Sequence, residues 1–415
     1  MIYANNNKIK GFGGIKRAYL NNTLIFQSFK KNEEVISPYD ITSTFNVTST
    51  TSPTTLSDRI SAITEMYVDG VQIDVASGYT FNTTGEHTVN YILADKTKIG
   101  TFLFDECSDL TSVYIGNGIT SIGDFAFRSC SGLTSVEIPS SVTSIGDGSF
   151  EYCSSLTSIN IPSSVTSIGY YSFEDCSSLT YIDIPSSVIN IGYDAFNNTP
   201  FYNNFPNGDV YLSSCYYKYK GTMPSNTSIT IKDGTKSIVG KAFQGCSGLT
   251  SIVIPDSVTT IGDRVFEECT HLNSVTIPES VTSIGHRAFY ECYRLTSINI
   301  PDSVTNISWN AFGYCERLTS VTIGSGVTSI YNYTFGSCKS LKSVTFGNSI
   351  TSIAEQSFYD CTSLNSITCY ATTAPTLDGR VFYYISKNGT LHVPQGSDYS
   401  SWLSKLPSGW TIEYI

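Results

Sequence analysis

The stretch Ile122-Gly123-Asp124-Phe125-Ala126-Phe127-Arg128-Ser129-Cys130-Ser131-Gly132-Leu133-Thr134-Ser135-Val136-Glu137-Ile138-Pro139-Ser140-Ser141-Val142-Thr143-Ser144 decides the fold of this 415-residue chain. Its pattern returns every 23 residues from Ile99 onward, breaks after Ile191, and resumes from Ile238 to Ile353. One position is phenylalanine in every copy: Phe104, Phe127, Phe150, Phe173, Phe196, Phe243, Phe266, Phe289, Phe312, Phe335 and Phe358. A fixed period of about 20–50 residues indicates a stack of similar units, so each unit is expected to form one turn of a solenoid.

Each unit divides into a strand and a tighter segment. Leu133-x-x-Val136-x-Ile138 alternates as a short half-buried strand does, and Pro139 ends it because proline cannot donate to a ladder. The apolar spacing from Ile122 to Cys130 is closer to three or four residues, which predicts a short helix or 3₁₀ turn. One such unit cannot bury its own apolar face, but stacked units can. The predicted fold is a repeat solenoid with a parallel β-sheet and short helices or 3₁₀ turns.

The chain outside the repeat predicts an all-β start and a cap. Residues 36–95 contain four strand-like runs, and Asp69-Gly70 between two of them is a strong hairpin signal. We expect a small immunoglobulin-like β-sandwich there. Residues 1–35 are expected to form a β-hairpin attachment module, with Asn21-Asn22 in its turn. The solenoid is expected over 96–394, with residues 395–415 as a C-terminal cap on its open end.

The break in the repeat predicts an insertion. Ile191 and Ile238 are 47 residues apart, which is two units plus one residue. Ile229-Thr230-Ile231-Lys232 still fits the strand position, so we expect residues of about 199–225 to be inserted within a retained coil. Two strand-like runs in this insertion, Asp209–Leu212 and Tyr216–Tyr219, predict a protruding hairpin.

Composition excludes several classes of protein. Only 14% of residues are charged and the net charge is −11, so a nucleic-acid binder that works through phosphate contacts is not expected. No apolar run is long enough to predict a membrane span. The polar start, Met1 to Lys8, shows no secretory signal, so we expect either that the chain is not exported by the secretory route or that its signal has been removed.

The cysteines and histidines do not predict a reactive centre. Ten of the twelve cysteines share one column of the repeat, without the close pairs that a zinc site needs. We expect buried thiols, although coils about 4.8 Å apart leave disulfides between neighbours geometrically open. Cys215 and Cys369 lie off the column and are the cysteines expected to be reactive. With no nucleophile elbow, carboxylate pair or ligand spacing, the sequence predicts no catalytic residue, no cofactor and no metal.

Comparison of the repeats with one another points to a binding surface. The outward strand positions are monotonous threonine and serine, whereas the variable positions cluster around the tighter segment. Tyr, Trp and Arg are enriched at binding hot spots because they bury large areas and still offer polar contacts. Neutral drift of exposed positions is the alternative explanation. The candidate binding residues are Tyr290, Tyr293, Arg294, Trp309, Tyr314, Arg317, Tyr331 and Tyr333.

The repeat Ile-Gly-x-x-Ala-Phe-x-x-Cys-x-x-Leu-x-x-Val-x-Ile-Pro resembles the BspA-type leucine-rich repeat over residues 99–394. That resemblance implies a curved right-handed solenoid without catalytic residues, in proteins that are mostly surface-exposed in gut and oral bacteria and are associated with adhesion. Residues 8–28, of the form Ile-x-x-Ala-Tyr-Leu-x-x-Thr-Leu-Ile-Phe, look like a short N-terminal module of phage structural and tail-associated proteins.

These features lead to one main hypothesis and its alternatives. The chain is expected to be a non-enzymatic recognition or adhesion protein, extracellular on a virion or a bacterial cell surface. Its expected partner is a protein or glycan on a host or bacterial surface, with virion proteins as partners of residues 1–35. A purely structural virion spacer is one alternative. A carbohydrate-active enzyme or carbohydrate-binding module is the other alternative, although the sequence does not allow a pair of catalytic carboxylates to be assigned.

Overall fold

The computed structural model describes residues 39–415 in full. Before them it describes only the backbone of β1 (Tyr3–Ala4), β2 (Asn7–Lys8), β3 (Lys16–Leu20), β4 (Thr23–Lys31) and β5 (Glu34–Ile36). The chain forms two compact units, Met1–Asn204 and Phe205–Ile415. β3 and β4 pair antiparallel with Leu20 opposite Thr23, so the N-terminal hairpin is confirmed.

The first unit begins with antiparallel sheet. β6 (Ile41–Val47), β11 (Gly85–Leu93), β8 (Ile63–Val68) and β9 (Val71–Ile73) are neighbours in that order, and β7 (Thr54–Thr55) pairs with β10 (Gly78–Tyr79) near the 3₁₀ turn Ile60–Ala62. Asp69 and Gly70 join β8 to β9 with φ angles of 48° and 81°, which confirms the predicted hairpin. β6 also pairs antiparallel with β13, so this sheet continues into the first coil. The all-β start is confirmed, while the limits at 35 and 95 stay predictions.

Two rows of parallel strands form the coils of the first unit. One row contains the longer strand of each coil, and the other contains a strand of only two residues from each coil. Partners in a row are 23 residues apart, as in Ser144↔Ser167. The short helix α1 (Pro200–Asn203) follows, with the Thr199 hydroxyl accepting from the backbone N–H of Tyr202. The strands are β13 (Leu110–Ile115), β15 (Ser135–Glu137), β17 (Ser158–Asn160) and β19 (Tyr181–Asp183) in one row, and β12 (Lys98–Ile99), β14 (Ser121–Ile122), β16 (Ser144–Ile145), β18 (Ser167–Ile168) and β20 (Asn190–Ile191) in the other.

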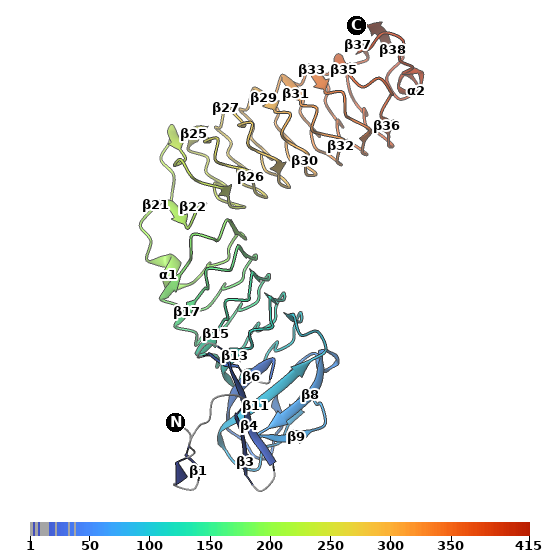
Figure 1. Cartoon of the computed structure of the whole chain (residues 1–415). Helices are drawn as coiled ribbons and strands as arrows, with labels where there is room; N and C mark the ends of the chain where they lie inside the picture. Colours follow the sequence, from blue (N-terminus) through green and yellow to red (C-terminus); the bar gives the residue numbers. More distant parts are fainter. Residues whose placement is uncertain (1–2, 5–6, 9–15, 21–22, 32–33, 37–38) are drawn as a thin grey trace. The chain divides into compact units, whose positions relative to one another are not determined.

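The second unit repeats the two rows (Figure 1). The predicted strand at Ile229 is confirmed as β23 (Thr227–Thr230). The chain ends with β37 (Asn388–Val393), the short helix α2 (Ser400–Leu403) and a last strand, β38 (Gly409–Tyr414), which pairs in parallel with β37. Among the described residues, no helix is both long enough and apolar enough to cross a bilayer. One row is β23 (Thr227–Thr230), β25 (Leu249–Val253), β27 (Ser274–Val275), β29 (Ser297–Ile300), β31 (Ser320–Ile323), β33 (Ser343–Phe346), β35 (Ser366–Cys369) and β37 (Asn388–Val393); the other is β22 (Cys215–Lys220), β24 (Ser237–Ile238), β26 (Thr260–Ile261), β28 (Ser283–Ile284), β30 (Asn306–Ile307), β32 (Ser329–Ile330), β34 (Ser352–Ile353) and β36 (Thr376–Leu377).

The inserted hairpin is part of the stack. β21 (Gly208–Leu212) and β22 pair antiparallel as predicted, but β22 also pairs in parallel with β24. Cys215, Tyr216 and Tyr217 are consecutive and all buried, as expected for a strand covered on both faces. The expectation that this hairpin protrudes is therefore wrong, whereas the limits of the insertion at 199 and 225 stay predictions.

The tighter segment of each coil is a run of turns: of the two expected forms, a short helix or a 3₁₀ turn, the helix is absent from these described segments, whereas hydrogen bonds of the 3₁₀ type, three residues back, are present. Phe125 and Ser129 have φ angles of 55° and 57°, and left-handed residues recur at corresponding positions in other coils. The N–H groups of Phe125, Phe127 and Ser129 donate to carbonyls of the next coil at 2.7–2.8 Å, while the alternate N–H groups donate three residues back. A helix would direct all of these amides along its own axis. Pairing between coils replaces the helix, although the apolar side chains still point inward.

Columns of identical side chains fill the core. The phenylalanine rings stack nearly parallel, as with Phe127 and Phe150 at 5.2 Å and 7°. The thiol of Cys130 donates to the Phe104 carbonyl at 2.9 Å, and other column cysteines make the same bond. All twelve cysteines are free and buried. The prediction that Cys215 and Cys369 are reactive is wrong: both are fully buried, and burial raises the pKa of the Cys369 thiol.

Candidate binding surface

The turns present two kinds of side chain in the second unit. Ala288 and Phe289 are fully buried, whereas Arg287 before them and Tyr290 after them reach the surface. Arg287 and Glu291 have φ angles of 52° and 60°, and these left-handed residues reverse the chain around the inward-pointing phenylalanine. The surface formed by such residues from Lys241 to Tyr384 is called the turn face below. Because the coils are in register, equivalent side chains on this face lie in columns.

Tyr290 and Tyr314 are the candidate residues that the structure brings into direct contact. Their rings meet edge to face, with centroids 5.3 Å apart, and the Arg287 guanidinium lies 4.7 Å from the centroid of the Tyr290 ring. Partial burial, followed by the nearby Tyr314 hydroxyl, raises the pKa of Tyr290. A methyl group at Gly313 would come within 3.1 Å of the Tyr290 ring, so glycine there lets the ring lie flat over the next coil.

Trp309 is the most exposed of the aromatic candidate residues, at 56%. Its ring lies over the His286 imidazole, with centroids 4.5 Å apart and planes tilted by 31°. The Nδ1 atom of His286 lies 2.9 Å from the Trp309 backbone oxygen, which ties the two coils together. The indole therefore has a supported position despite its exposure.

Three further candidates lie where the turns lead into the longer strands. Tyr293 donates its hydroxyl to Glu291 at 2.6 Å, and this hydrogen bond raises the pKa of Tyr293. Arg294 and Arg317 are exposed at equivalent positions of successive coils, just before β29 and β31. The structure therefore places the two arginines in one column, separate from the Tyr290–Tyr314 contact.

Tyr331 and Tyr333 are exposed by 47% and 36%. Tyr331 lies directly after β32, and Tyr333 is a left-handed residue with a φ angle of 56°. A methyl group at Gly336 would lie 3.3 Å from the Tyr333 ring, so this ring also covers a glycine. Tyr290 therefore covers a glycine of the next coil, and Tyr333 a glycine of its own coil.

The sequence prediction missed a second group of aromatic residues in the last coils. Tyr359 lies edge to face with Tyr384 at 5.4 Å and nearly parallel to Tyr383 at 6.4 Å, while Tyr383 and Tyr384 meet at 4.6 Å. The Arg380 guanidinium lies 5.9 Å from the Tyr383 ring centroid. The signal was present in the sequence, because Phe358-Tyr359 and Phe382-Tyr383 repeat the pair Phe289-Tyr290.

A buried carboxylate lies below the start of the turn face. Glu267 is 3% exposed and receives the Gln244 amide at 2.5 Å, with Arg264 and Arg287 each 3.4 Å away. The Nε atom of Arg287 is buried without a hydrogen-bond partner. This cluster holds the Arg287 guanidinium against the Tyr290 ring and so fixes the positions of these two side chains on the turn face.

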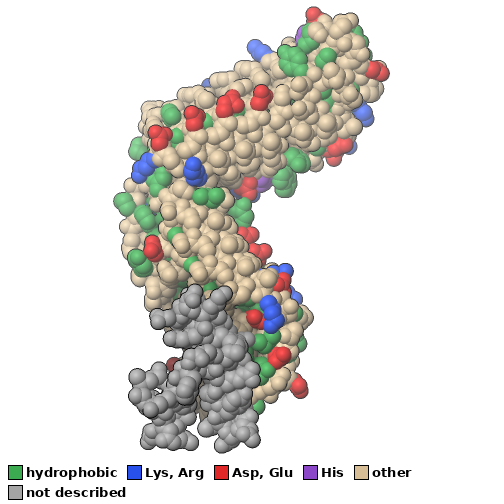
Figure 2. Space-filling model, viewed as in Figure 1, with side chains coloured by type: hydrophobic (Ala, Val, Ile, Leu, Met, Phe, Trp, Pro, Cys, Tyr) green, Lys and Arg blue, Asp and Glu red, His purple; other side chains and the backbone are tan. Residues whose placement is uncertain are grey.

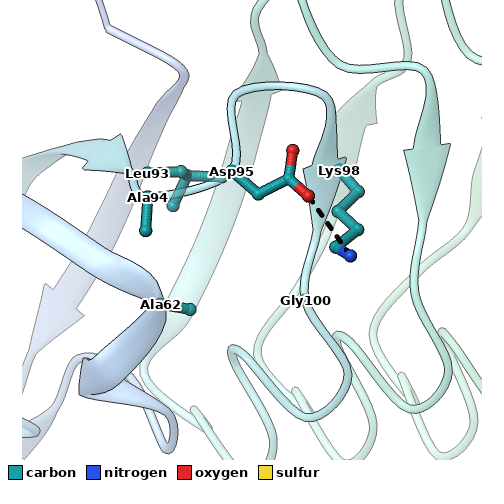
Figure 3. Close-up of a pocket in the computed structure, with 6 residues that line it drawn as sticks. All are labelled: Ala62, Leu93, Ala94, Asp95, Lys98 and Gly100. Atoms are coloured by element: carbon teal, nitrogen blue, oxygen red, sulfur yellow. Dashed lines mark ion pairs between the residues drawn. The ribbon is translucent and has the colours of Figure 1, made fainter.

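A cavity in the first unit is too small to compete as a ligand site. It has a volume of about 90 Å³ and is lined by Ala62, Leu93, Ala94, Asp95, Lys98 and Gly100 (Figure 3). Drug-sized ligands occupy pockets of about 300–1,000 Å³. Asp95 pairs with Lys98 at 3.2 Å, and hydrogen bonds from Thr97 and Lys98 lower the pKa of Asp95 to about 2. Among the described residues, no group of three or more His, Cys, Asp or Glu side chains could hold a metal ion.

Solved structures of bacterial repeat proteins resemble this chain. A leucine-rich repeat protein from Eubacterium ventriosum is 27% identical, with 73% of this chain and 87% of that chain covered and a TM-score of 0.41. A leucine-rich cell surface protein from Faecalibacterium prausnitzii is 24% identical, with 76% and 86% covered and a TM-score of 0.29. The pneumococcal vaccine antigen PcpA is 17% identical, with 79% and 86% covered and a TM-score of 0.41.

A comparison with curated proteins finds no match. The repeat, however, matches the model of a protein family. The model of the BspA type leucine rich repeat region matches in six copies, over residues 97–208, 213–342 and 305–401. These matches cover well over half of the chain and coincide with the stacked coils. The chain therefore belongs to the BspA-type leucine-rich repeat family.

Proposed function

We propose that this chain is a non-enzymatic recognition protein that binds a partner through the turn face of its second unit. The observation that carries this proposal is the set of exposed aromatic rings that successive coils present side by side, among them Trp309, Tyr333 and Tyr384. Such rings lose little conformational freedom on binding, because the stacked backbone already fixes their spacing. A surface of this kind supports adhesion to a protein or glycan outside the cell.

The test is attachment of the full chain to candidate target cells or matrix. Replacing Tyr290, Arg294, Trp309 and Tyr333 together by alanine should weaken attachment by at least about tenfold, as expected when several hot-spot side chains are lost. The matched control replaces Tyr152 and Tyr181, which are exposed by 48% and 63% in the first unit. Circular dichroism should show the same fold for both variants. Unchanged attachment of the four-residue variant would make the solenoid a spacer.

The proposal assigns a second role to residues 1–35, whose side chains lie outside the described residues. They would attach the protein to a larger assembly on a cell surface or, as the resemblance of residues 8–28 suggests, on a virion. Deleting residues 1–35 should leave a folded solenoid that no longer sediments with its particle or surface. A truncated protein that still assembles normally would remove the attachment role and leave the binding role intact.

A further inference from the structure

The turn face carries an ordered series of tyrosines, named the tyrosine track here: Tyr290, Tyr314, Tyr333, Tyr359, Tyr383 and Tyr384. Ring contacts join its first two members at 5.3 Å and its last three at 4.6–6.4 Å. Tyr333, which is 36% exposed, lies on the coil between those of Tyr314 and Tyr359. The track therefore runs along the stack, with at least one ring for each coil from Phe289 to Phe382.

The coils beneath the track have a regular spacing, and the tyrosine rings follow it less strictly, with centroids 5.3 Å apart for Tyr290 and Tyr314 and 6.4 Å apart for Tyr359 and Tyr383. Stacked phenylalanines beneath it are 5.0 Å apart between Phe289 and Phe312, and 5.3 Å apart between Phe335 and Phe358. A pyranose unit in an extended polysaccharide advances by a similar distance, so successive sugars could meet successive coils.

The chemistry of the exposed side chains fits a sugar better than an apolar protein patch. Between residues 284 and 384, all of which the structure describes, every large hydrophobic side chain that is exposed is aromatic: Trp309, Tyr314, Tyr331, Tyr333, Tyr370, Tyr383 and Tyr384. Aromatic faces carry partial negative charge and attract the C–H groups on the flat face of a pyranose. Tyrosine hydroxyls and the exposed Asn332 amide add donors and acceptors for the hydroxyl groups at the sugar edge.

The charges near the track favour an uncharged polymer. Glu316 and Lys339 neutralise each other at 2.9 Å, and Arg380 lies over Tyr383. In Figure 2, the visible surface of the second unit is mostly uncharged and polar, apart from a row of acidic side chains along one edge. Cations do not form a long column along these coils: Asn310, Tyr333 and Gln356 follow Arg287 at its position, and the column of Arg294 and Arg317 ends at Ser340.

We propose that the tyrosine track binds an extended, neutral polysaccharide whose pyranose rings stack on tyrosines of successive coils. This proposal rests on the proposed function and adds the chemical class of the partner. Binding through a series of rings predicts a dependence on chain length. Affinity should rise with each added sugar until the oligosaccharide spans the track, and then level off.

The test measures binding of the full chain to neutral polysaccharides by affinity electrophoresis, with β-glucan, α-glucan, galactomannan and xylan as probes. An oligosaccharide series from the bound polymer is then titrated by calorimetry. Replacing Tyr383 and Tyr384 by alanine should weaken binding of long oligomers by at least about tenfold and leave short ones that bind near Tyr290 much less affected. The corresponding phenylalanine variant should retain most of the affinity, because its rings remain. Tyr152→Ala in the first unit is the control.

Three outcomes would overturn the inference: no binding to any of the four polysaccharides, affinity independent of oligomer length, or unchanged affinity in the Tyr383/Tyr384 alanine variant. The first of these separates the two proposals. If the polysaccharides do not bind but the four-residue variant still loses attachment to a purified surface protein, the turn face recognises protein and only the glycan inference fails. If attachment is also unchanged, the proposed function fails as well.

Discussion

The turns of the two units share a backbone but carry different side chains. In the first unit, the position after the column phenylalanine holds Asp105, Arg128, Glu151 and Glu174, whereas the equivalent position in the second unit holds Tyr290, Tyr359 and Tyr383 among others. The buried phenylalanine columns are the same in both. The comparison shows that packing fixes the inward positions of the repeat and leaves the outward positions open to acquire a function.

The largest expected effect tests whether the two cores are equivalent. Phe127→Ala in the first unit and Phe289→Ala in the second should each lower the free energy of unfolding by about 3–5 kcal/mol, because each leaves a cavity in a stacked column. Denaturant unfolding followed by circular dichroism measures both. A loss below about 1 kcal/mol at either site would show that the columns do not contribute alike.

A smaller effect separates the charged clusters of the two units. Arg128 forms a two-pronged pair with Asp105 at 2.6 and 2.9 Å, whereas Glu267 has both Arg264 and Arg287. Arg128→Met should therefore cost about 1–3 kcal/mol, since the largely buried Asp105 loses its charged partner. Arg264→Met should cost less than about 1 kcal/mol, because Glu267 keeps Arg287 and Gln244. Equal losses in denaturant unfolding would contradict this distinction.

The smallest effect is a pH dependence confined to the first unit. Burial, and then the neighbouring Glu174 carboxylate, raises the pKa of Glu151. A carboxyl group whose pKa is raised by folding favours the folded state at low pH, and this contribution is lost as the pH rises through the folded pKa. Glu151→Gln should therefore slightly increase stability at neutral pH, with the gain disappearing in acid. The control is Tyr290→Gln, at the equivalent position of the second unit, which should show no such pH-dependent difference in stability. If the gain in stability of Glu151→Gln persists in acid, the raised pKa of Glu151 is not its cause.

The repeat predicted the inward positions because burial is periodic. Phe127, Cys130 and Leu133 lie where the column pattern puts them. The same pattern predicted a short helix or 3₁₀ turn for this segment but not the pairing of alternate amides with the next coil, because apolar spacing reports which side chains point inward and not which carbonyl each amide reaches. The hairpin β21–β22 was found from its strand-like runs, but its pairing with β24 was not, because Tyr216-Tyr217 carries no mark of its parallel neighbour.

The candidate surface was predicted in part for a related reason. Variation among repeats picked out Tyr290, Trp309 and Tyr314, but variation alone does not show which rings touch. The contact of Tyr290 with Tyr314, the support of Trp309 by His286, and the cluster around Tyr359 depend on the register between coils. That register became available only with the fold.

The cysteine column has a consequence for measurement. Its thiols are buried, and most of them, from Cys130 to Cys361, bond to a phenylalanine carbonyl of the preceding coil, so a thiol reagent can reach one only after neighbouring coils separate. Burial also raises the pKa of these thiols and suppresses the reactive thiolate. Each coil that carries a column cysteine therefore contains its own reporter of local opening. Alkylation rates read by peptide mass spectrometry, from Cys107 to Cys361, would record where the stack frays first.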